Sequence, residues 1–174
     1  IDSNSFSTLF NLGRIYQQRG DLEKALETFE KIFKLKNVNS LDLVFNEIGI
    51  TLQKKEDFNS AIKAYLKAIQ LNKNLIQSYN NLGYAQFEIE DFDSAEISFL
   101  KAIKLSPQNA IARKNLSKIY LLKGNYKEGF KNYEYRYEQS NIRILPHASP
   151  NIPIWSGEDS ERPNKLLVVS EQGL

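Results

Sequence analysis

Cysteine and methionine are absent from the 174 residues, and histidine and tryptophan occur once each. Without cysteine the chain has no disulfide, no thiolate nucleophile and no cysteine metal site. Such a composition suits a reducing compartment, and we expect a cytoplasmic location. The lone His147 has no second histidine or cysteine with which to share a metal. We therefore expect no metal site and no catalytic histidine.

Long apolar runs are also missing. No run approaches the roughly 18 residues needed to span a bilayer, and the mean hydropathy is -0.46. The opening stretch IDSNSFSTLF has neither the basic nor the apolar region of a signal peptide, and it lacks an initiator methionine, as expected of a processed product or a fragment. The net charge is only +2, with lysine and glutamate interspersed. This balance predicts neither nucleic acid nor an acidic membrane as a partner.

The sequence shows no common catalytic motif: there is no GxSxG, no P-loop and no HExxH. Glu158, Asp159 and Glu161 form an acidic cluster near Trp155, but a paired-carboxylate site needs a pocket that gives the two groups different environments. A solvated loop is the simpler interpretation. We expect no catalytic residue and no cofactor in this chain, which is not expected to be an enzyme by itself.

What the sequence does contain is a repeat. Four units follow one another, at about residues 6–39, 42–75, 76–109 and 110–139. Each unit has the apolar periodicity of two amphipathic helices. Asp21, Asp57, Asp91 and Asn125 stand where the second helix begins and are good N-cap residues. Three kinds of position recur in phase: a small residue in the first helix (Gly13, Gly49, Gly83, Ser117), a small residue in the second (Ala25, Ala61, Ala95, Gly129) and an aromatic four residues later (Phe29, Tyr65, Phe99, Tyr133).

This pattern resembles the tetratricopeptide repeat (TPR) family, whose unit is a 34-residue helix pair. The resemblance implies an all-α, right-handed solenoid of about four helix pairs over residues 1–139. Two extra residues after the first unit, within LKNVNSLD, are expected to lengthen a loop. Stacked helix pairs form a curved solenoid, and the first helix of each pair lines its concave groove.

We expect this groove to bind a protein or an extended peptide. The sixth position of the unit holds Asn11, Asn81 and Asn115, and Glu47 breaks the series, which is similar to the asparagine ladder of O-GlcNAc transferases. An asparagine amide both donates to and accepts from a peptide backbone, although a simply solvated asparagine is the alternative. The full set of expected groove residues is Asn11, Arg14, Asn46, Asn80, Asn81, Tyr84, Phe87, Lys114, Asn115 and Lys118.

Some of these residues have alternative roles. Phe10, Tyr84 and Phe87 would anchor a ligand or pack against a neighbouring helix. Lys114 and Lys118, one helical turn apart, would receive an acidic group or remain solvated.

The composition changes after Ser140. Residues 140–164 hold four of the five prolines, which exclude a helix, yet several of their side chains are apolar. We expect an extended segment packed on the last helices. Lys165 to Ser170 then form a predicted strand, because four apolar residues follow one another with Gly173 just beyond.

The tail resembles the junction at which bacterial TPR proteins join a glycosyltransferase-like (GT-B) domain. The matching stretches are EGFKNYEYRYE, PIWSGE and LLVVSEQGL. The resemblance implies that residues 165–174 begin a truncated α/β domain and that the repeats present an acceptor to it. Two functions stay open: a TPR scaffold that forms part of a larger glycosyltransferase-like protein, and a stand-alone TPR adaptor. Self-association through the unpaired strand 165–170 is a further alternative.

Overall fold

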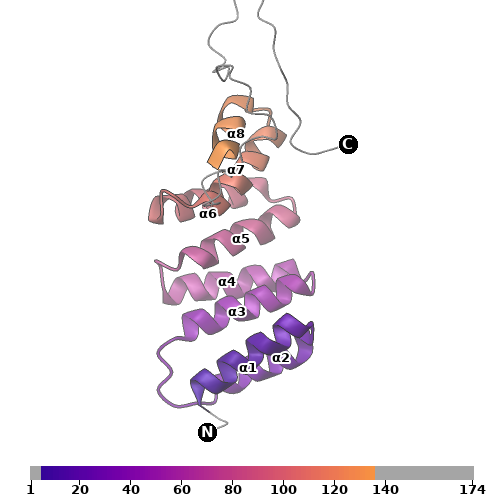
Figure 1. Cartoon of the computed structure of the whole chain (residues 1–174), viewed down its shortest axis with the longest axis vertical. Helices are drawn as coiled ribbons and strands as arrows, with labels where there is room; N and C mark the ends of the chain where they lie inside the picture. The colour runs from indigo at the N-terminus through magenta and orange to yellow at the C-terminus, as the bar shows by residue number, and fades with distance from the viewer. Residues whose placement is uncertain (1–4, 136–174) are drawn as a thin grey trace, which may run out of the picture.

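The computed structural model describes residues 5–135, which fold into eight α-helices without a strand (Figure 1). Neighbouring helices pair in sequence order, α1 with α2 through to α7 with α8. The helices are α1 (Phe6–Arg19), α2 (Leu22–Ile32), α3 (Leu41–Lys54), α4 (Phe58–Leu71), α5 (Ile76–Glu88), α6 (Phe92–Leu105), α7 (Ala110–Leu122) and α8 (Tyr126–Tyr133). The prediction of an all-helical solenoid is confirmed for these residues. The expected proline-rich segment 140–164 and strand 165–170 lie outside them.

The recurring small and aromatic positions form the contact between the two helices of a pair. A Cβ atom added to Gly13 would lie 2.5 Å from the ring of Phe29, and one added to Gly83 would lie 2.8 Å from the ring of Phe99. Real Cβ atoms do not approach other atoms so closely, so the aromatic ring occupies the space that the glycine leaves empty. Phe29 and Phe99 are fully buried, as is Tyr65 beside Gly49.

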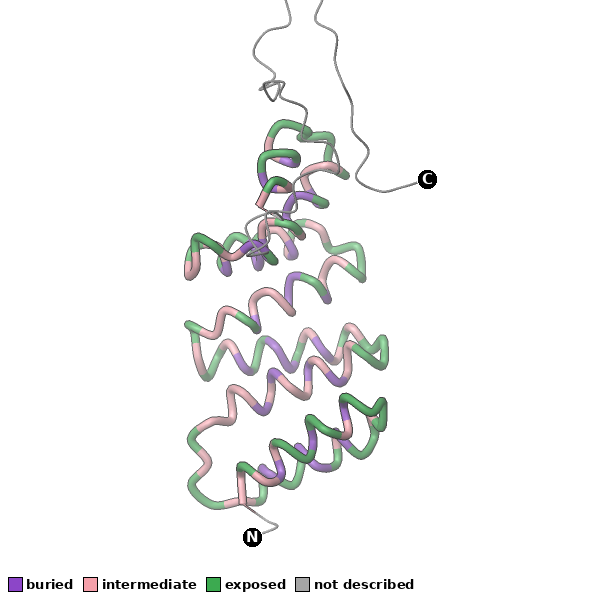
Figure 2. Tube along the Cα trace, viewed as in Figure 1, coloured by how far each residue is buried: buried purple, intermediate pink, exposed green. Residues whose placement is uncertain are grey.

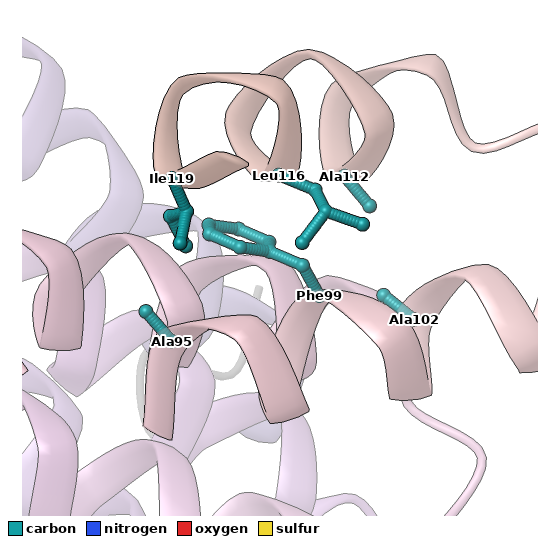
Figure 3. Packing of buried hydrophobic residues seen from close by; sticks show 6 residues of the cluster. All are labelled: Ala95, Phe99, Ala102, Ala112, Leu116 and Ile119. Atoms are coloured by element: carbon teal, nitrogen blue, oxygen red, sulfur yellow. The ribbon is translucent and has the colours of Figure 1, made fainter. Parts of the chain in front are cut away.

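Each aromatic also joins its unit to the next one. Phe99 of α6 points between Ala95 and Ala102 of its own helix toward α7, where three apolar side chains surround it (Figure 3): Ala112, Leu116 and Ile119. The buried positions therefore run along the whole stack as a continuous interior rather than as one central core (Figure 2). This is the nearest-neighbour stacking of a solenoid, in which each unit is stabilised by the adjacent one.

The turn inside each unit has the same left-handed backbone in all four units. Gly20 and Gly124 adopt φ angles of 83° and 76°, as glycine does readily. The equivalent residues of the second and third units are Glu56 and Glu90, which adopt φ angles of 61° and 62°. For a non-glycine residue this conformation is less favourable by roughly 1 kcal/mol. The second and third units therefore keep the same turn although their residues favour it less than glycine does, and local backbone hydrogen bonds such as Asp57 N–H to Leu52 O close it.

Three of the four expected N-caps form. The side chains of Asp57, Asp91 and Asn125 accept hydrogen bonds from backbone N–H groups of the helix that follows, over 3.1, 3.2 and 3.4 Å. Asp21 occupies the equivalent position but makes no side-chain cap bond.

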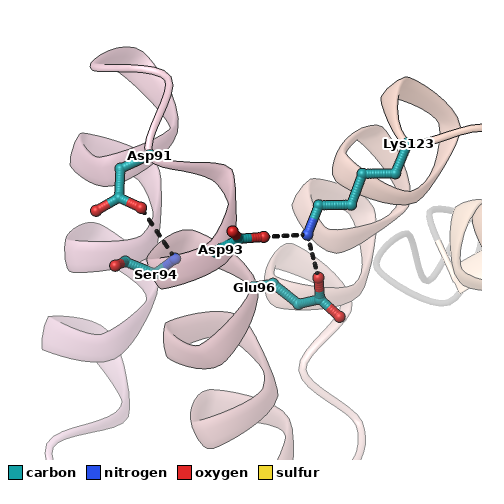
Figure 4. A network of polar contacts seen from close by, with 5 residues as sticks. All are labelled: Asp91, Asp93, Ser94, Glu96 and Lys123. Atoms are coloured by element: carbon teal, nitrogen blue, oxygen red, sulfur yellow. Dashed lines mark hydrogen bonds and ion pairs between the residues drawn. The ribbon is translucent and has the colours of Figure 1, made fainter.

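Exposed ion pairs join the outer edges of neighbouring units. Lys123, just after α7, reaches Asp93 and Glu96 of α6 at 2.7 Å each (Figure 4). Lys55, just after α3 of the second unit, makes the equivalent contact with Glu23 of the first unit, at 3.0 Å. Exposed pairs of this kind contribute little to stability, but they occupy the carboxylates at the N-terminal end of α6.

The two extra residues after the first unit lengthen the connection between α2 and α3, as expected. This loop passes beside the start of α1 and forms an open depression lined in part by Phe6, Leu35 and Val38. The longer loop does not interrupt the stack, because α3 still contacts both α1 and α2.

The two sides of the stack differ in spacing. Each first helix contacts the next first helix, α1 to α3, α3 to α5 and α5 to α7, whereas no two second helices come as close. The stack is therefore narrower on the side of the first helices. We call the side formed by α1, α3, α5 and α7 the inner face and the side formed by α2, α4, α6 and α8 the outer face; the outer face is convex.

Candidate functional site

The inner face carries one open stripe along each first helix. On α7 this stripe is clearest, because Ile111, Lys118 and Leu122 are exposed while Leu116 and Ile119 between them are buried. These exposed residues occupy the second, ninth and thirteenth positions of the unit. The same positions, with the sixth, are exposed or half-buried in every unit: Ser7, Asn11, Arg14 and Gln18; Leu43, Glu47, Ile50 and Lys54; Gln77, Asn81, Tyr84 and Glu88; Ile111, Asn115, Lys118 and Leu122.

The fifth and twelfth positions, by contrast, turn toward neighbouring helices in the first three units. This corrects the expectation for Asn46, which is only 4% exposed. Its side-chain oxygen accepts hydrogen bonds from Ser78 Oγ at 2.8 Å and from Asn81 Nδ2 at 3.2 Å. Asn46 therefore joins α3 to α5 and is not available to a ligand.

A second buried polar contact joins α1 to α3. Gln17 Nε2 donates to Thr51 Oγ1 at 3.0 Å and to the backbone oxygen of Glu47 at 3.2 Å. Gln17 is 7% exposed and Thr51 is fully buried. The sequence offered one signal for these contacts: a polar residue at the fifth or twelfth position faces a serine or threonine about one unit later.

The aromatic residues behave differently from one another. Phe87 packs on Phe92 of α6 with ring centroids 5.3 Å apart, and Phe10 lies between Phe6 and Phe29 at 5.4 and 6.1 Å. For Phe10 and Phe87 the structure thus shows packing within the protein. Tyr84 remains on the surface with 36% of its area exposed.

The asparagines of the expected ladder are not equivalent. Asn11 is exposed, whereas Asn81 is half-buried and donates its amide N–H to the side-chain oxygen of Asn46. Asn115 is half-buried on α7. The neighbouring Asn80 holds its side-chain oxygen buried, without a hydrogen-bond partner among the described residues. A buried unpaired acceptor costs free energy, so the side-chain oxygen of Asn80 is an unsatisfied group inside the stack and not one that is open to a ligand.

Charges on the inner face are unequal. Arg14, Lys114 and Lys118 are exposed, and Lys54 is exposed while its Nζ donates to the backbone oxygen of Gln17 at 3.2 Å. Lys118 Nζ also lies 6.0 Å from the ring centroid of Phe87. These cations lie at the two ends of the stack, with Arg14 and Lys54 in the first two units and the remaining two lysines in the fourth.

The carboxylates of the stripe lie between these cations. Burial raises the pKa of Glu47, against the opposing effects of Arg14, Gln17 and Lys54. The carboxylate of Glu88 beside the Tyr84 hydroxyl is the largest reason why the pKa of Tyr84 is raised. Both carboxylates keep a negative charge on the second and third units, so the inner face is most clearly cationic on α7, which carries Lys114 and Lys118 and no acidic residue.

Neither a metal site nor a membrane span is present between residues 5 and 135. No group of three or more histidine, cysteine, aspartate or glutamate side chains in that range lies close enough to hold a metal ion. None of the eight helices there has both the length and the apolar character that crossing a membrane requires.

Two family models match the chain, one described as "TPR repeat" over residues 49–89 and the other as "Tetratricopeptide repeat" over residues 6–39 and 76–109. Together they match more than half of the chain. The chain belongs to the tetratricopeptide repeat (TPR) family. The small and aromatic positions on which the family resemblance rests are therefore those that form the inter-helix contacts described above.

Among proteins of known sequence, this TPR chain is similar to a TPR repeat-containing protein of Methanocaldococcus jannaschii, with 30% identity over 93 residues. The match covers 45% of this chain and 16% of the relative. Because the chain spans such a small share of that relative, the likeness concerns the repeats and not the activity of a whole protein.

Solved structures confirm the fold. MamA has a TM-score of 0.70 at 25% identity, covering 79% of this chain and 80% of its own. YrrB, described as a TPR protein with an unusual peptide-binding site, has a TM-score of 0.64 at 22% identity, over 79% of this chain and 70% of its own. The first TPR of Spaghetti (RPAP3), bound to an HSP90 peptide, has a TM-score of 0.64 at 20% identity, over 71% and 97%.

Proposed function

We propose that this TPR domain is a scaffold that binds an extended, acidic segment of a partner protein along its inner face. The observation that carries the proposal is the open stripe that runs through all four units at the same positions. Because the repeat brings polar side chains to this stripe in every unit, an extended backbone can contact several units at once. Related folds are described with peptide sites, in YrrB and in the RPAP3 domain bound to an HSP90 peptide.

Energetics explain why charge enters the proposal. A net hydrogen bond contributes roughly 0.5–1.5 kcal/mol, so the three ladder asparagines supply about 3 kcal/mol in the middle of that range. Even millimolar affinity requires a binding free energy of about 4 kcal/mol. In addition, the amide nitrogen of Asn81 already donates a hydrogen bond to Asn46. The remaining free energy must come from other groups, namely the exposed ring of Tyr84 and the cations Lys114 and Lys118. Carboxylates on the ligand are the groups that these lysines bind.

The proposal is tested by selecting binders from randomised linear peptides and measuring their affinity by fluorescence anisotropy. We expect enrichment of aspartate and glutamate. Lys114→Gln with Lys118→Gln is expected to weaken the selected peptide about threefold to tenfold, since exposed charge contacts contribute up to roughly 1 kcal/mol each. The matched control is Lys31→Gln with Lys34→Gln on the outer side of the first unit, which should leave affinity unchanged. Absence of any binder, or equal loss in both variants, would contradict the proposal.

A second function concerns the tail. Its stretches PIWSGE and LLVVSEQGL favour a scaffold that belongs to a larger glycosyltransferase-like protein and presents an acceptor to that domain. This remains a prediction from residues 136–174, beyond the described part of the chain. Calorimetric titration of a chain extended past Leu174 with nucleotide sugars tests it, with the 174-residue chain as the control. We expect binding by the extended chain alone, and binding by neither would favour a stand-alone adaptor.

A further inference from the structure

The outer side of α4 and α6 carries large aliphatic side chains in the open. Leu66 of α4 is 50% exposed, and Ile97 and Leu100 of α6 are 69% and 44% exposed. Leu66 and Leu100 occupy the same position in consecutive units, and Ile97 lies one turn before Leu100. The two helices therefore present their aliphatic residues in register, on the convex side of the stack.

Exposed lysines lie close in sequence to these aliphatic residues on both helices. Lys63 and Lys67 flank Leu66 on α4, while Lys101 and Lys104 follow Leu100 on α6, and all four are exposed. We call the three aliphatic residues and these four lysines the outer patch. α4 contains no aspartate or glutamate at all. The two carboxylates of α6, Asp93 and Glu96, are both bound by Lys123.

The outer patch is a local feature that the average charge of the chain conceals. The first unit has glutamates, Glu27 and Glu30, at the positions where the second unit has Lys63 and Leu66. The net charge of +2 with interspersed lysine and glutamate is thus an average over units whose outer helices differ in charge. An anionic surface would meet the second and third units favourably and the first unit unfavourably.

From these observations we propose that the outer patch is a peripheral contact site for an anionic lipid surface. Aliphatic side chains entering the interface beside lysines that meet anionic headgroups are the pattern by which proteins lie on a membrane without crossing it. The convex shape allows the middle units to touch a flat surface while the inner face points away from it. Centres of protein–protein interfaces, in contrast, are enriched in aromatic residues and arginine and depleted of lysine, and the outer patch has no aromatic residue and no arginine.

The test is co-sedimentation of the whole chain with vesicles of phosphatidylcholine alone and of phosphatidylcholine mixed equally with phosphatidylserine. We expect binding to the mixed vesicles only, weakening as salt is added because the lysine contribution is screened. Replacing Lys63, Lys67, Lys101 and Lys104 by glutamine is expected to weaken partitioning at least about tenfold. Ile97→Ser with Leu100→Ser should weaken it as well, at unchanged net charge.

A matched variant separates a specific patch from general charge. Lys31, Lys34, Lys36 and Lys127 are equally exposed but lie outside the outer patch, and replacing them by glutamine gives the same net charge as the patch variant. This control should bind mixed vesicles like the unchanged chain. Equal loss in both variants, or no binding of the unchanged chain at low salt, would overturn the proposal. Light scattering on the same samples would overturn it in favour of a second copy if the unchanged chain dimerises and the patch variants do not.

Circular dichroism of each variant establishes that the helices are retained, which is expected because every substituted side chain is exposed. The peptide proposal and the lipid proposal use opposite faces of the stack. Lys114→Gln with Lys118→Gln should therefore leave vesicle binding intact, and the patch variants should leave peptide affinity intact, so one proposal can fail without the other.

Discussion

Phe99→Ala is expected to lower the free energy of unfolding by roughly 3–5 kcal/mol, the usual cost of truncating a fully buried phenylalanine. The Phe99 ring fills the space between α5, α6 and α7, and it has no exposed surface. Alanine residues flank it on α6, and the neighbouring side chains belong to rigid helices. The cavity left behind should therefore close only in part. Urea unfolding followed by circular dichroism measures the loss.

The position of Phe99 also predicts where the damage appears. Because each unit is stabilised mainly by its neighbour, α7 and α8 should lose protection from amide hydrogen exchange before α1 to α4 do. Leu100→Ala is the matched control, one residue further along the same helix, with 44% of its side chain in solvent. It should cost about 1 kcal/mol or less. Equal losses for the two variants would show that Phe99 does not hold the third and fourth units together.

Gly49→Val should destabilise the protein by roughly 2–3 kcal/mol through overpacking. The added methyl groups would enter the space of the Tyr65 ring, which is fully buried. Tyr65 cannot move aside freely, because its hydroxyl donates a hydrogen bond to Gln53 Oε1 at 3.0 Å. Gly49→Ala should cost less because it adds only the Cβ atom, but it should still destabilise the protein, since that atom already overlaps the buried Tyr65 ring.

A double-mutant cycle checks the cause. If the valine is destabilising because it meets the Tyr65 ring, then combining Gly49→Val with Tyr65→Leu should lose less free energy than the sum of the two single variants. Both single variants and the double variant are measured by the same urea titration. Additive losses would mean that the glycine is required for a reason other than the ring.

Much of the fold follows from residues that are close together in sequence. The helices begin near their expected caps, and the aromatics Phe29, Tyr65 and Phe99 are buried where the small residues leave room. These features depend on the 3.6-residue period and on contacts within one helix pair, both of which a single unit contains. The extra residues after the first unit lengthen a loop for the same reason, since they fall between two pairs and not inside one.

The candidate site was predicted less completely. Asn11, Arg14, Lys114 and Lys118 are exposed on the inner face, but Asn46 is buried, and Phe87 packs against α6. Periodicity gives the side of a helix on which a residue lies. Periodicity does not give the orientation of one unit relative to the next. That orientation decides whether the residues at the fifth and twelfth positions face solvent or a neighbouring helix.

The sequence by itself therefore determined the repeat, the order of the helices and the identity of the inter-helix aromatics, because these are set by spacing within about one unit. Only the tertiary structure decided which polar residues are consumed in contacts between units, as with Asn46 and Gln17. It also showed that Glu56 and Glu90 adopt a left-handed turn and that four lysines and three aliphatic residues are exposed on α4 and α6. The contacts of Asn46 and Gln17 join groups 32 and 34 residues apart in sequence, which stacking brings together and local periodicity does not specify.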